Sequence, residues 1–169
     1  GKSTLAAVLA SRGHLLISDD VLAVQPGPQG TLAYTGNRSL RLWRETLELL
    51  GHDPSGLRRA AIGERDKYFL PAPPGPVIAP TWPFAALVWM AAKQTKIEKI
   101  GLMAGAMERA QGVQKAIYRD HLAREYNRRG FTALNDLSLP GVDVYVMIRP
   151  RDLSRLDIQA DMIEALVTR

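Results

Sequence analysis

The sequence predicts an α/β fold that begins in a phosphate-binding loop, and three observations indicate it. Residues 1–4 read GKST, the last third of the G-x-x-x-x-G-K-[ST] motif that precedes a helix. A helical run rich in Ala and Leu follows, and then a short apolar run that ends in Asp19-Asp20. Residues 142–148 form a second apolar run, rich in Val and Ile, and typical of a strand. Because the chain opens inside the motif, we expect the N-terminal strand and the first part of the loop to be absent from it.

The first four residues carry the chemistry of a nucleotide site. Lys2 would place a positive charge on the β- and γ-phosphates, and the hydroxyl of Ser3 would ligate Mg²⁺. The backbone N–H groups at Gly1 and Thr4 lie where a helix begins, and unpaired N–H groups there attract anionic oxygens. The alternative is an ordinary helix start, since Ser and Thr are good N-caps.

Two adjacent carboxylates end the next predicted strand. The helix is expected to stop before Gly13, and residues 14–17 then read as a short buried strand leading to Asp19 and Asp20. In a parallel sheet that strand end lies on the same rim as the phosphate loop. Two neighbouring carboxylates repel each other, which costs free energy unless a cation or a proton neutralises part of their charge. The alternative is an Asx-turn or the entry to a hairpin.

The middle of the chain predicts short elements separated by turns. Residues 21–25 and 31–34 flank a Pro- and Gly-rich connector and predict a hairpin. Residues 40–44 lead into a short helix, 45–50, and a further short helix follows Asp53-Pro54. A proline-rich stretch, 71–76, predicts a stiff extended connection before a central strand at 84–90.

The last third predicts a long helix, a strand and a final helix. The helix spans 100–129, with a break near Gly112, and an apolar face of residues at helical spacing: Met103, Met107, Ala110, Val113 and Ile117. Its basic residues form either a solvated surface or a dock for an acidic partner. The strand at 142–148 stops at Arg149-Pro150, and a helix that starts at Asp152 or Ser154 buries Leu156, Ile163 and Leu166.

Composition narrows the class of protein. A length of 169 residues with 46% hydrophobic residues predicts one globular domain, residues 1–169. No apolar run reaches the about 18 residues that a membrane-spanning helix needs. There is no Cys, so disulfides and thiolate metal sites are excluded. The net charge of +5 suits an anionic ligand, but the basic residues are dispersed and no aromatic platform is visible, so we expect no nucleic acid and no membrane partner.

The N-terminal pattern resembles the catalytic domain of the HPr kinase/phosphorylase family and the related serine kinases. The resemblance is carried by GKST, by the Ala/Leu helix and Arg12-Gly13-His14, and by the strand that ends in Asp19-Asp20. Weaker similarity continues at residues 40–44 and 67–71 and in the final strand and helix. The family implies a phosphate-loop fold related to phosphoenolpyruvate carboxykinase.

The resemblance also implies roles for individual residues. Lys2 binds phosphates and is counted with the catalytic residues, and Ser3 binds Mg²⁺. Asp19 is the base on the acceptor hydroxyl, and Asp20 is the carboxylate on the metal side. His14, at a helix-to-strand junction, is expected to be structural, and only the resemblance makes Lys67 a candidate phosphate contact.

One departure limits the implied activity. The Glu-containing segment, rich in Arg and Gly, that serves phosphate removal in bifunctional members has no counterpart, because residues 35–39 read TGNRS instead. Arg41 and Arg44 either grip a phosphate or a substrate carboxylate or remain solvated beside a packed Trp43.

We therefore expect an ATP- and Mg²⁺-dependent cytoplasmic kinase that phosphorylates a serine on a protein or peptide, with an acidic substrate as one option. Two alternatives remain open: a kinase of a small metabolite, and a protein that binds ATP as a sensor without catalysis. The sequence does not indicate an oligomeric state.

Overall fold

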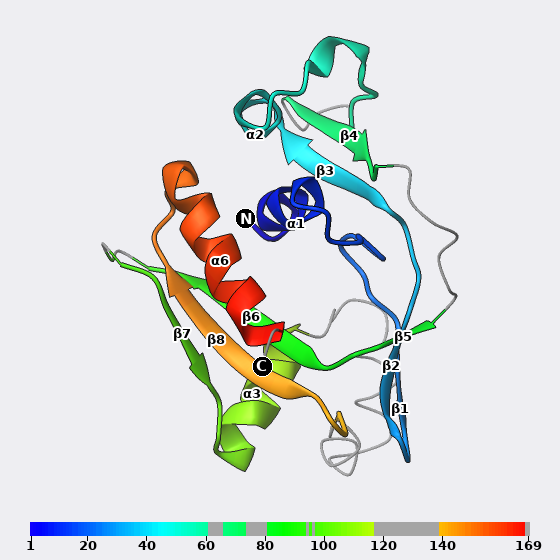
Figure 1. Cartoon of the computed structure of the whole chain (residues 1–169), viewed down its shortest axis with the longest axis vertical. Coiled ribbons are helices and arrows are strands. Elements are labelled where there is room, and N and C mark those ends of the chain that lie inside the picture. The colour runs from blue at the N-terminus through cyan, green and yellow to red at the C-terminus, as the bar shows by residue number, and fades with distance from the viewer. Residues whose placement is uncertain (61–65, 74–80, 94, 96, 117–138, 168–169) are drawn as a thin grey trace. The chain divides into compact units, whose positions relative to one another are not determined.

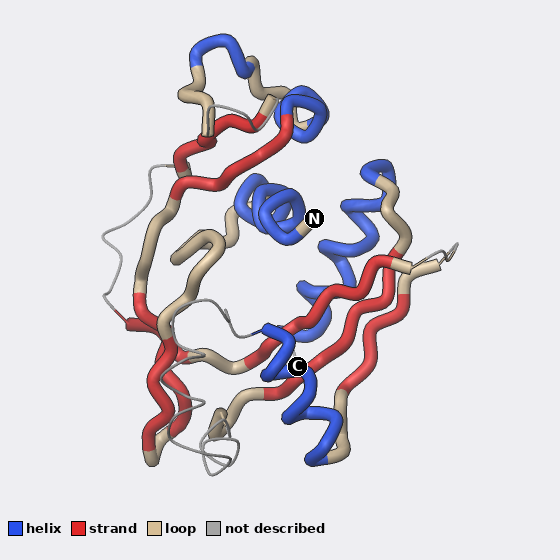
Figure 2. The backbone as a smooth tube through the Cα atoms, turned by 180° about the vertical axis from the view of Figure 1, so that it is seen from behind, coloured by secondary structure: helices blue, strands red, loops and turns tan. Residues whose placement is uncertain are grey.

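The computed structural model shows a mixed α/β chain and describes residues 1–60, 66–73, 81–93, 95, 97–116 and 139–167 (Figures 1 and 2). The described residues group into two compact units. Residues 1–22, 35–80 and 152–169 belong to the first, and residues 23–34 and 81–151 to the second. We describe each unit by itself, and the single nucleotide-binding domain expected from the sequence stays a prediction.

The described residues of the first unit form three α-helices, a two-stranded sheet and two 3₁₀ turns. In chain order these are α1 (Lys2–Ser11), β3 (Ser39–Trp43), α2 (Arg44–Leu49), η1 (Pro54–Gly56), β4 (Lys67–Pro71), η2 (Leu153–Arg155) and α6 (Leu156–Val167). The helix at 45–50 and the short helix after Asp53 were each predicted to within a residue or two, whereas residues 40–44 were not predicted to form a strand. Asp53 and Asp152 cap the two 3₁₀ turns by accepting hydrogen bonds from Ser55 N and Ser154 N.

A glycine reverses the chain after α1. Gly13 has a φ of +98°, which side chains other than glycine rarely adopt, and this confirms the predicted helix stop. The ten residues of α1 rise about 15 Å, at about 1.5 Å per residue. Residues 14–18, if extended at about 3.3 Å each, cover about 16 Å. The returning chain therefore reaches the level at which α1 began, and this brings Asp19 back to Ser3.

The prediction of a strand at residues 14–17 is wrong. The segment has no regular strand pairing; it meets residues 36–37 through only two backbone hydrogen bonds, from Gly36 N to Ile17 O at 2.9 Å and from Asp19 N to Asn37 O at 2.7 Å. Arg38 adds a side-chain bond to Leu16 O at 2.8 Å. The apolar side chains are half-buried, not buried as predicted, and the described residues form no parallel sheet around this segment.

The core of the first unit lies between α1 and the β3–β4 sheet. The strands are antiparallel, with Leu42 opposite Tyr68 and Leu40 opposite Leu70. Leu40 and Leu42 are buried and alternate with exposed Arg41 and Trp43, so one face of the sheet packs inward and the other faces solvent. Leu47 from α2, which is fully buried, and Ala7 from α1 complete this cluster.

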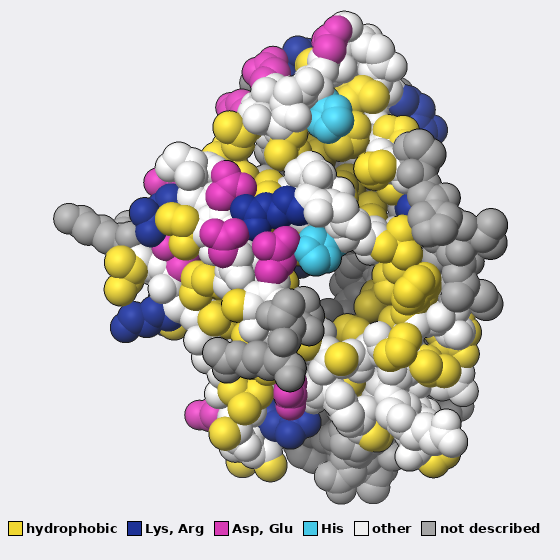
Figure 3. Space-filling view, in the orientation of Figure 1, with side chains coloured by type: hydrophobic (Ala, Val, Ile, Leu, Met, Phe, Trp, Pro, Cys, Tyr) yellow, Lys and Arg dark blue, Asp and Glu magenta, His cyan; other side chains and the backbone are white. Residues whose placement is uncertain are grey.

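An arginine connects α1 to α6. Arg12 contacts Asp157, Asp161 and Glu164 at 2.7–2.8 Å. These carboxylates lie four and three residues apart and so share one face of α6. His14 Nε2 lies 2.8 Å from Glu164 Oε1, which gives His14 the structural contact expected for it. Figure 3 shows acidic, basic and histidine side chains gathered over these elements.

This cluster shifts the titration of its members. Hydrogen bonds to Asp157 and Asp161 raise the pKa of Arg12 above its usual range. The hydrogen bond from His14, with those from Arg12, lowers the pKa of Glu164. Both shifts favour the charged forms, so the cluster is strongest where Glu164 is ionised.

The second unit is built from two three-stranded sheets and one described helix. Its elements are β1 (Val24–Gly27), β2 (Gly30–Tyr34), β5 (Thr81–Pro83), β6 (Ala86–Ala92), β7 (Lys99–Leu102), α3 (Ala106–Ala116) and β8 (Asp143–Arg149). β1, β2 and β5 are antiparallel neighbours in that order, which confirms the predicted hairpin.

The second sheet places β8, and not the strand predicted to be central, in its middle. Its order is β6-β8-β7, with β6 parallel and β7 antiparallel to β8. Among the described residues β6 therefore has one strand neighbour, and its side chains are half-buried along most of its length. Val144 and Met147 of β8 are buried, as a central strand requires.

The long helix predicted from residue 100 begins later. Residues 100–102 belong to β7, because Gly101 and Gly105 weaken a helix and the partner β8 satisfies the backbone there. Gly112 does not break α3; a Cβ at this position would lie 2.8 Å from Met103 Sδ and 2.9 Å from Val144 Cγ1. The glycine thus lets α3 approach β8 closely.

The apolar face predicted for this helix is correct in part. Val113 is buried, but Met107 is 74% exposed, which contradicts its placement in the core. The guanidinium of Arg109 on α3 donates a hydrogen bond to Val142 O, just before β8, at 2.9 Å. Ile117 and the rest of the predicted helix, to residue 129, lie outside the described residues. Within the described ranges, no helix combines the length and the apolar character that crossing a bilayer requires.

Candidate functional site

The start of α1 presents backbone donors. Gly1 is the N-cap, no side chain caps it, and the first helical hydrogen bond runs from Leu5 N to Gly1 O at 3.1 Å. The N–H groups of Lys2, Ser3 and Thr4 therefore have no partner within the helix, as at every helix start. Lys2 is exposed, whereas Thr4 is buried, with an exposed fraction of 7%. Thr4 can thus contribute its N–H group, and Lys2 an exposed positive charge.

A tight turn holds the two carboxylates. Val21 N donates to Asp19 O at 2.7 Å, which closes a three-residue turn with Asp20 at its centre. Asp20 has a φ of +60°, an uncommon value for a residue with a side chain. Ser18 Oγ donates to Val21 O at 2.7 Å and closes the same turn from outside. Backbone strain of this kind is concentrated at functional sites, so the positive φ of Asp20 supports this turn as part of the candidate site.

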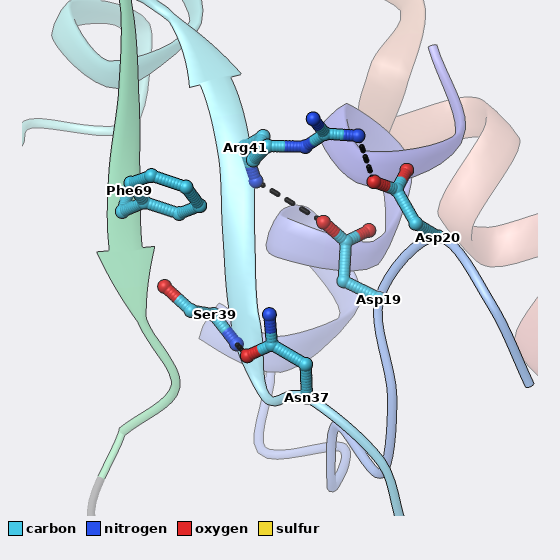
Figure 4. A pocket seen from close by; sticks show the side chains of 6 residues that line it. All are labelled: Asp19, Asp20, Asn37, Ser39, Arg41 and Phe69. Atoms are coloured by element: carbon cyan, nitrogen blue, oxygen red, sulfur yellow. Dashed lines mark hydrogen bonds and ion pairs between the residues drawn. The ribbon is translucent and has the colours of Figure 1, made fainter. Parts of the chain in front are cut away.

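The turn brings Asp19 against the helix start. Ser3 Oγ donates to Asp19 Oδ1 at 3.0 Å, and Arg41 N donates to Asp19 Oδ2 at 3.1 Å. The guanidinium of Arg41 forms an ion pair with Asp20 (Figure 4). One residue of β3 therefore holds both carboxylates, Asp19 through its backbone and Asp20 through its side chain.

An open pocket of about 300 Å³ lies beside these groups. Figure 4 shows the six residues that line it: Asp19, Asp20, Asn37, Ser39, Arg41 and Phe69. Asn37 Oδ1 accepts a hydrogen bond from Ser39 N at 3.0 Å and so shapes the entry to β3. The pocket combines two carboxylates, a hydroxyl, an amide, a guanidinium and one aromatic ring.

The structure brings together some of the residues that the sequence singled out. Ser3 meets Asp19, although the sequence paired Ser3 with Asp20 for the metal. Asp20 instead contacts Arg41. The assignment of separate roles to the two carboxylates stays a prediction.

Two other candidate cations lie away from the pocket lining. The Nζ of Lys67 lies 4.6 Å from the centre of the Trp43 ring. Arg44 lies over Tyr68 and near Glu48 and Asp66, at 3.7 and 3.8 Å. Its guanidinium therefore contacts protein groups outside the pocket lining.

Sequence reasoning missed three pocket residues: Asn37, Ser39 and Phe69. The alternation of Ser39, Leu40, Arg41 and Leu42 carried a signal, because it places Ser39 and Arg41 on one face of a strand. Nothing in the sequence indicated that Phe69 would lie opposite Arg41, since that pairing depends on the register of β3 with β4.

The donor set fits a hard divalent cation. Mg²⁺ takes oxygen ligands, and it is usually bound by one or two carboxylates together with phosphate oxygens and water. Ser3 and the two aspartates offer such oxygens. In the part of the chain that is described, no group of three or more His, Cys, Asp or Glu side chains could hold a metal by itself.

Comparisons with protein-family models, with curated proteins and with solved structures gave no match.

Proposed function

We propose that this chain is an ATP- and Mg²⁺-dependent kinase that phosphorylates a serine hydroxyl on a protein or peptide. The observation that carries the proposal is the hydrogen bond from Ser3 to Asp19. It places a helix start bearing Lys2 beside two adjacent carboxylates. The resemblance of residues 1–20 to HPr kinase-type domains supports the same chemistry.

Different groups of the site would bind the phosphates of ATP and the Mg²⁺ ion. The N–H groups of residues 2–4 and the ammonium of Lys2 would hold the phosphates of ATP. Ser3 Oγ and one carboxylate would hold Mg²⁺. Bound Mg²⁺ would supply charge neutralisation on the β- and γ-phosphate oxygens.

The other carboxylate would act on the acceptor. It accepts the proton of the serine hydroxyl as the serine oxygen bonds to the γ-phosphorus and the bond from phosphorus to the β–γ bridging oxygen breaks, so that ADP leaves. Each oxygen of Asp19 already accepts one hydrogen bond, and a carboxylate oxygen has a second lone pair for another.

Two assignments of the carboxylates compete. The family resemblance gives the proton to Asp19 and the metal to Asp20. The contact between Ser3 and Asp19 favours the reverse, because Ser3 is the expected metal ligand. In either assignment Arg41 must release Asp20 before that carboxylate can act.

Radiolabelled ATP and a serine-containing peptide library test the proposal. We expect label on serine, loss of transfer in Lys2→Ala, and unchanged transfer in Asp143→Asn, which removes an exposed carboxylate from the second unit. Absence of any transfer, with intact ATP binding by calorimetry, would favour an ATP sensor. Transfer to small hydroxyl compounds alone would favour a metabolite kinase.

Substitution of each aspartate separates their roles. The variant that lacks the proton acceptor should bind Mg·ATP normally and lose turnover by at least about 100-fold, the usual scale of general-base catalysis. The variant that lacks the metal-side carboxylate should need more Mg²⁺ for both binding and turnover. If Asp19→Asn and Asp20→Asn both keep near-normal turnover, the mechanism is wrong.

The reverse reaction provides a directional test. Because residues 35–39 lack the segment associated with phosphate removal, we expect no release of pyrophosphate when phosphorylated acceptor is incubated with excess inorganic phosphate. Stoichiometric pyrophosphate would show that other residues carry that chemistry.

A further inference from the structure

The solvent face of the sheet beside the pocket carries a row of basic and aromatic side chains. Phe69 is opposite Arg41 on β3, and on the other edge of β4 it bonds through its N–H to Arg58 O at 2.9 Å. The three residues therefore lie side by side across three extended segments, with Phe69 in the middle. Lys67 and Trp43 form the neighbouring pair. We call these five residues the basic face.

Aromatic rings position the cations of the basic face. The guanidinium of Arg58 lies 4.4 Å from the centre of the Phe69 ring, and the ammonium of Lys67 lies 4.6 Å from that of Trp43. Both distances are within the range of cation–π attraction. Among the described residues, no carboxylate is paired with Arg58. Trp43 remains 47% exposed.

The basic face is continuous with the pocket. Arg41 and Phe69 belong to both, and Ser39 continues the same face of β3 toward Asn37. A chain that lay along this face would pass directly beside Asp19 and Asp20. A neutral serine hydroxyl group carried by such a chain could approach these carboxylates.

The cations of the basic face are held by its rings. Arg58 lies over Phe69 and Lys67 lies over Trp43, so each ring carries a positive charge on one of its faces. The arrangement presents positive charge at fixed positions, which is what a carboxylate-rich chain requires.

We infer that the basic face binds the acceptor, an extended acidic peptide whose serine reaches the carboxylates of the pocket. The inference rests on the proposed function and deepens it by naming the acceptor class and its binding surface. Side chains of Asp or Glu in the peptide would contact Arg58 and Lys67, and Trp43 would cover its apolar atoms.

Fluorescence anisotropy of labelled peptides, without nucleotide, tests the inference on the full chain. The probes are a short peptide with one serine among Asp and Glu residues, the same peptide with Lys in place of the acids, and a single-stranded oligothymidylate. We expect binding of the acidic peptide alone, weakened severalfold between about 0.05 and about 0.3 M salt by charge screening.

Matched variants locate the binding surface. Arg58→Gln should weaken binding of the acidic peptide about threefold to tenfold, as expected for loss of one charge-assisted contact. Lys99→Gln removes one exposed charge from β7 and should leave binding unchanged. Trp43→Ala, at a half-exposed position, should also weaken binding, and circular dichroism checks that each variant is folded.

Several outcomes would overturn the inference. These are equal or tighter binding of the oligothymidylate, equal binding of the basic peptide, or equal effects of Arg58→Gln and Lys99→Gln. Because no nucleotide is present, a negative result here leaves kinase activity to be judged by labelled ATP. If transfer is found, Arg58→Gln should raise the KM for the peptide while the KM for ATP stays constant; the opposite pattern would assign the face to ATP.

Discussion

Gly36 is the position at which the smallest added group should disturb the candidate site. A Cβ there would lie 2.5 Å from Ser18 Oγ and 3.3 Å from Ser18 Cβ. Ser18 Oγ donates to Val21 O and closes the turn that carries the carboxylates. Gly36→Ala therefore forces the Ser18 hydroxyl to rotate away and breaks this hydrogen bond, while the backbone bond from residue 36 to Ile17 O can persist.

The change in the free energy of unfolding caused by Gly36→Ala is the sum of opposing contributions. Loss of one hydrogen bond costs about 0.5–1.5 kcal/mol. The displaced Ser18 side chain adds strain of about 0.5–1.5 kcal/mol. Replacement of Gly by Ala regains about 0.4–1 kcal/mol because the unfolded chain loses freedom. We expect Gly36→Ala to destabilise the wild-type chain by about 1 kcal/mol.

A double-mutant cycle isolates the cause. In Ser18→Ala the hydroxyl and its hydrogen bond are already gone, so Gly36→Ala should then be within about 0.5 kcal/mol of neutral. The free energy of unfolding is measured by urea titration of the four proteins. Gly56→Ala is the control, because a Cβ there meets no atom within 4 Å. Equal costs of Gly36→Ala in both backgrounds would refute the reasoning.

Three further predictions concern stability. Leu47→Ala, at a fully buried side chain, should cost about 2–5 kcal/mol in urea titration, against under about 1 kcal/mol for Leu49→Ala, whose side chain is 54% exposed. Because its bond to His14 lowers the pKa of Glu164, the stabilising contribution of that carboxylate is complete above its unfolded pKa and is lost as pH falls through the lower folded value. Thermal unfolding should show a smaller loss on acidification in Glu164→Gln than in the wild type. Arg12→Gln should lower the melting temperature, and added salt should narrow its difference from the wild type; a difference independent of salt would contradict an ionic role.

Local signals in the sequence predicted local structure well. Gly13 was correctly predicted to stop the helix, because a helix stop depends on a few neighbouring residues. The alternation around Leu40 was an equally local signal of β3, but it was not used to predict a strand. The strand at residues 14–17 failed because apolar character indicates burial, and a strand also needs a partner with a matching ladder. Residues 100–102 became a strand because β8 lies beside them, which periodicity cannot reveal.

Only the part of the candidate site that lies near the beginning of the sequence could be predicted. Ser3 and Asp19 were both singled out, since motif and spacing pointed to them. Arg41 was predicted as a possible phosphate contact. Its interactions with Asp19 and Asp20 depend on where β3 lies relative to those residues, which the sequence does not show. Phe69 could not be predicted as a pocket residue from the sequence, because its position there depends on the register of β3 with β4.

The contact between Ser3 and Asp19 also has a kinetic consequence. The two residues are separated by 16 positions, whereas Arg12 and Glu164 are separated by 152. Closing a short loop costs less chain entropy and occurs sooner than closing a long one. The contact of Ser3 with Asp19 can therefore form earlier in folding than the ion pairs that join Arg12 to α6. The pocket is complete only when β3 has paired with β4, because Arg41 and Phe69 come from these two strands.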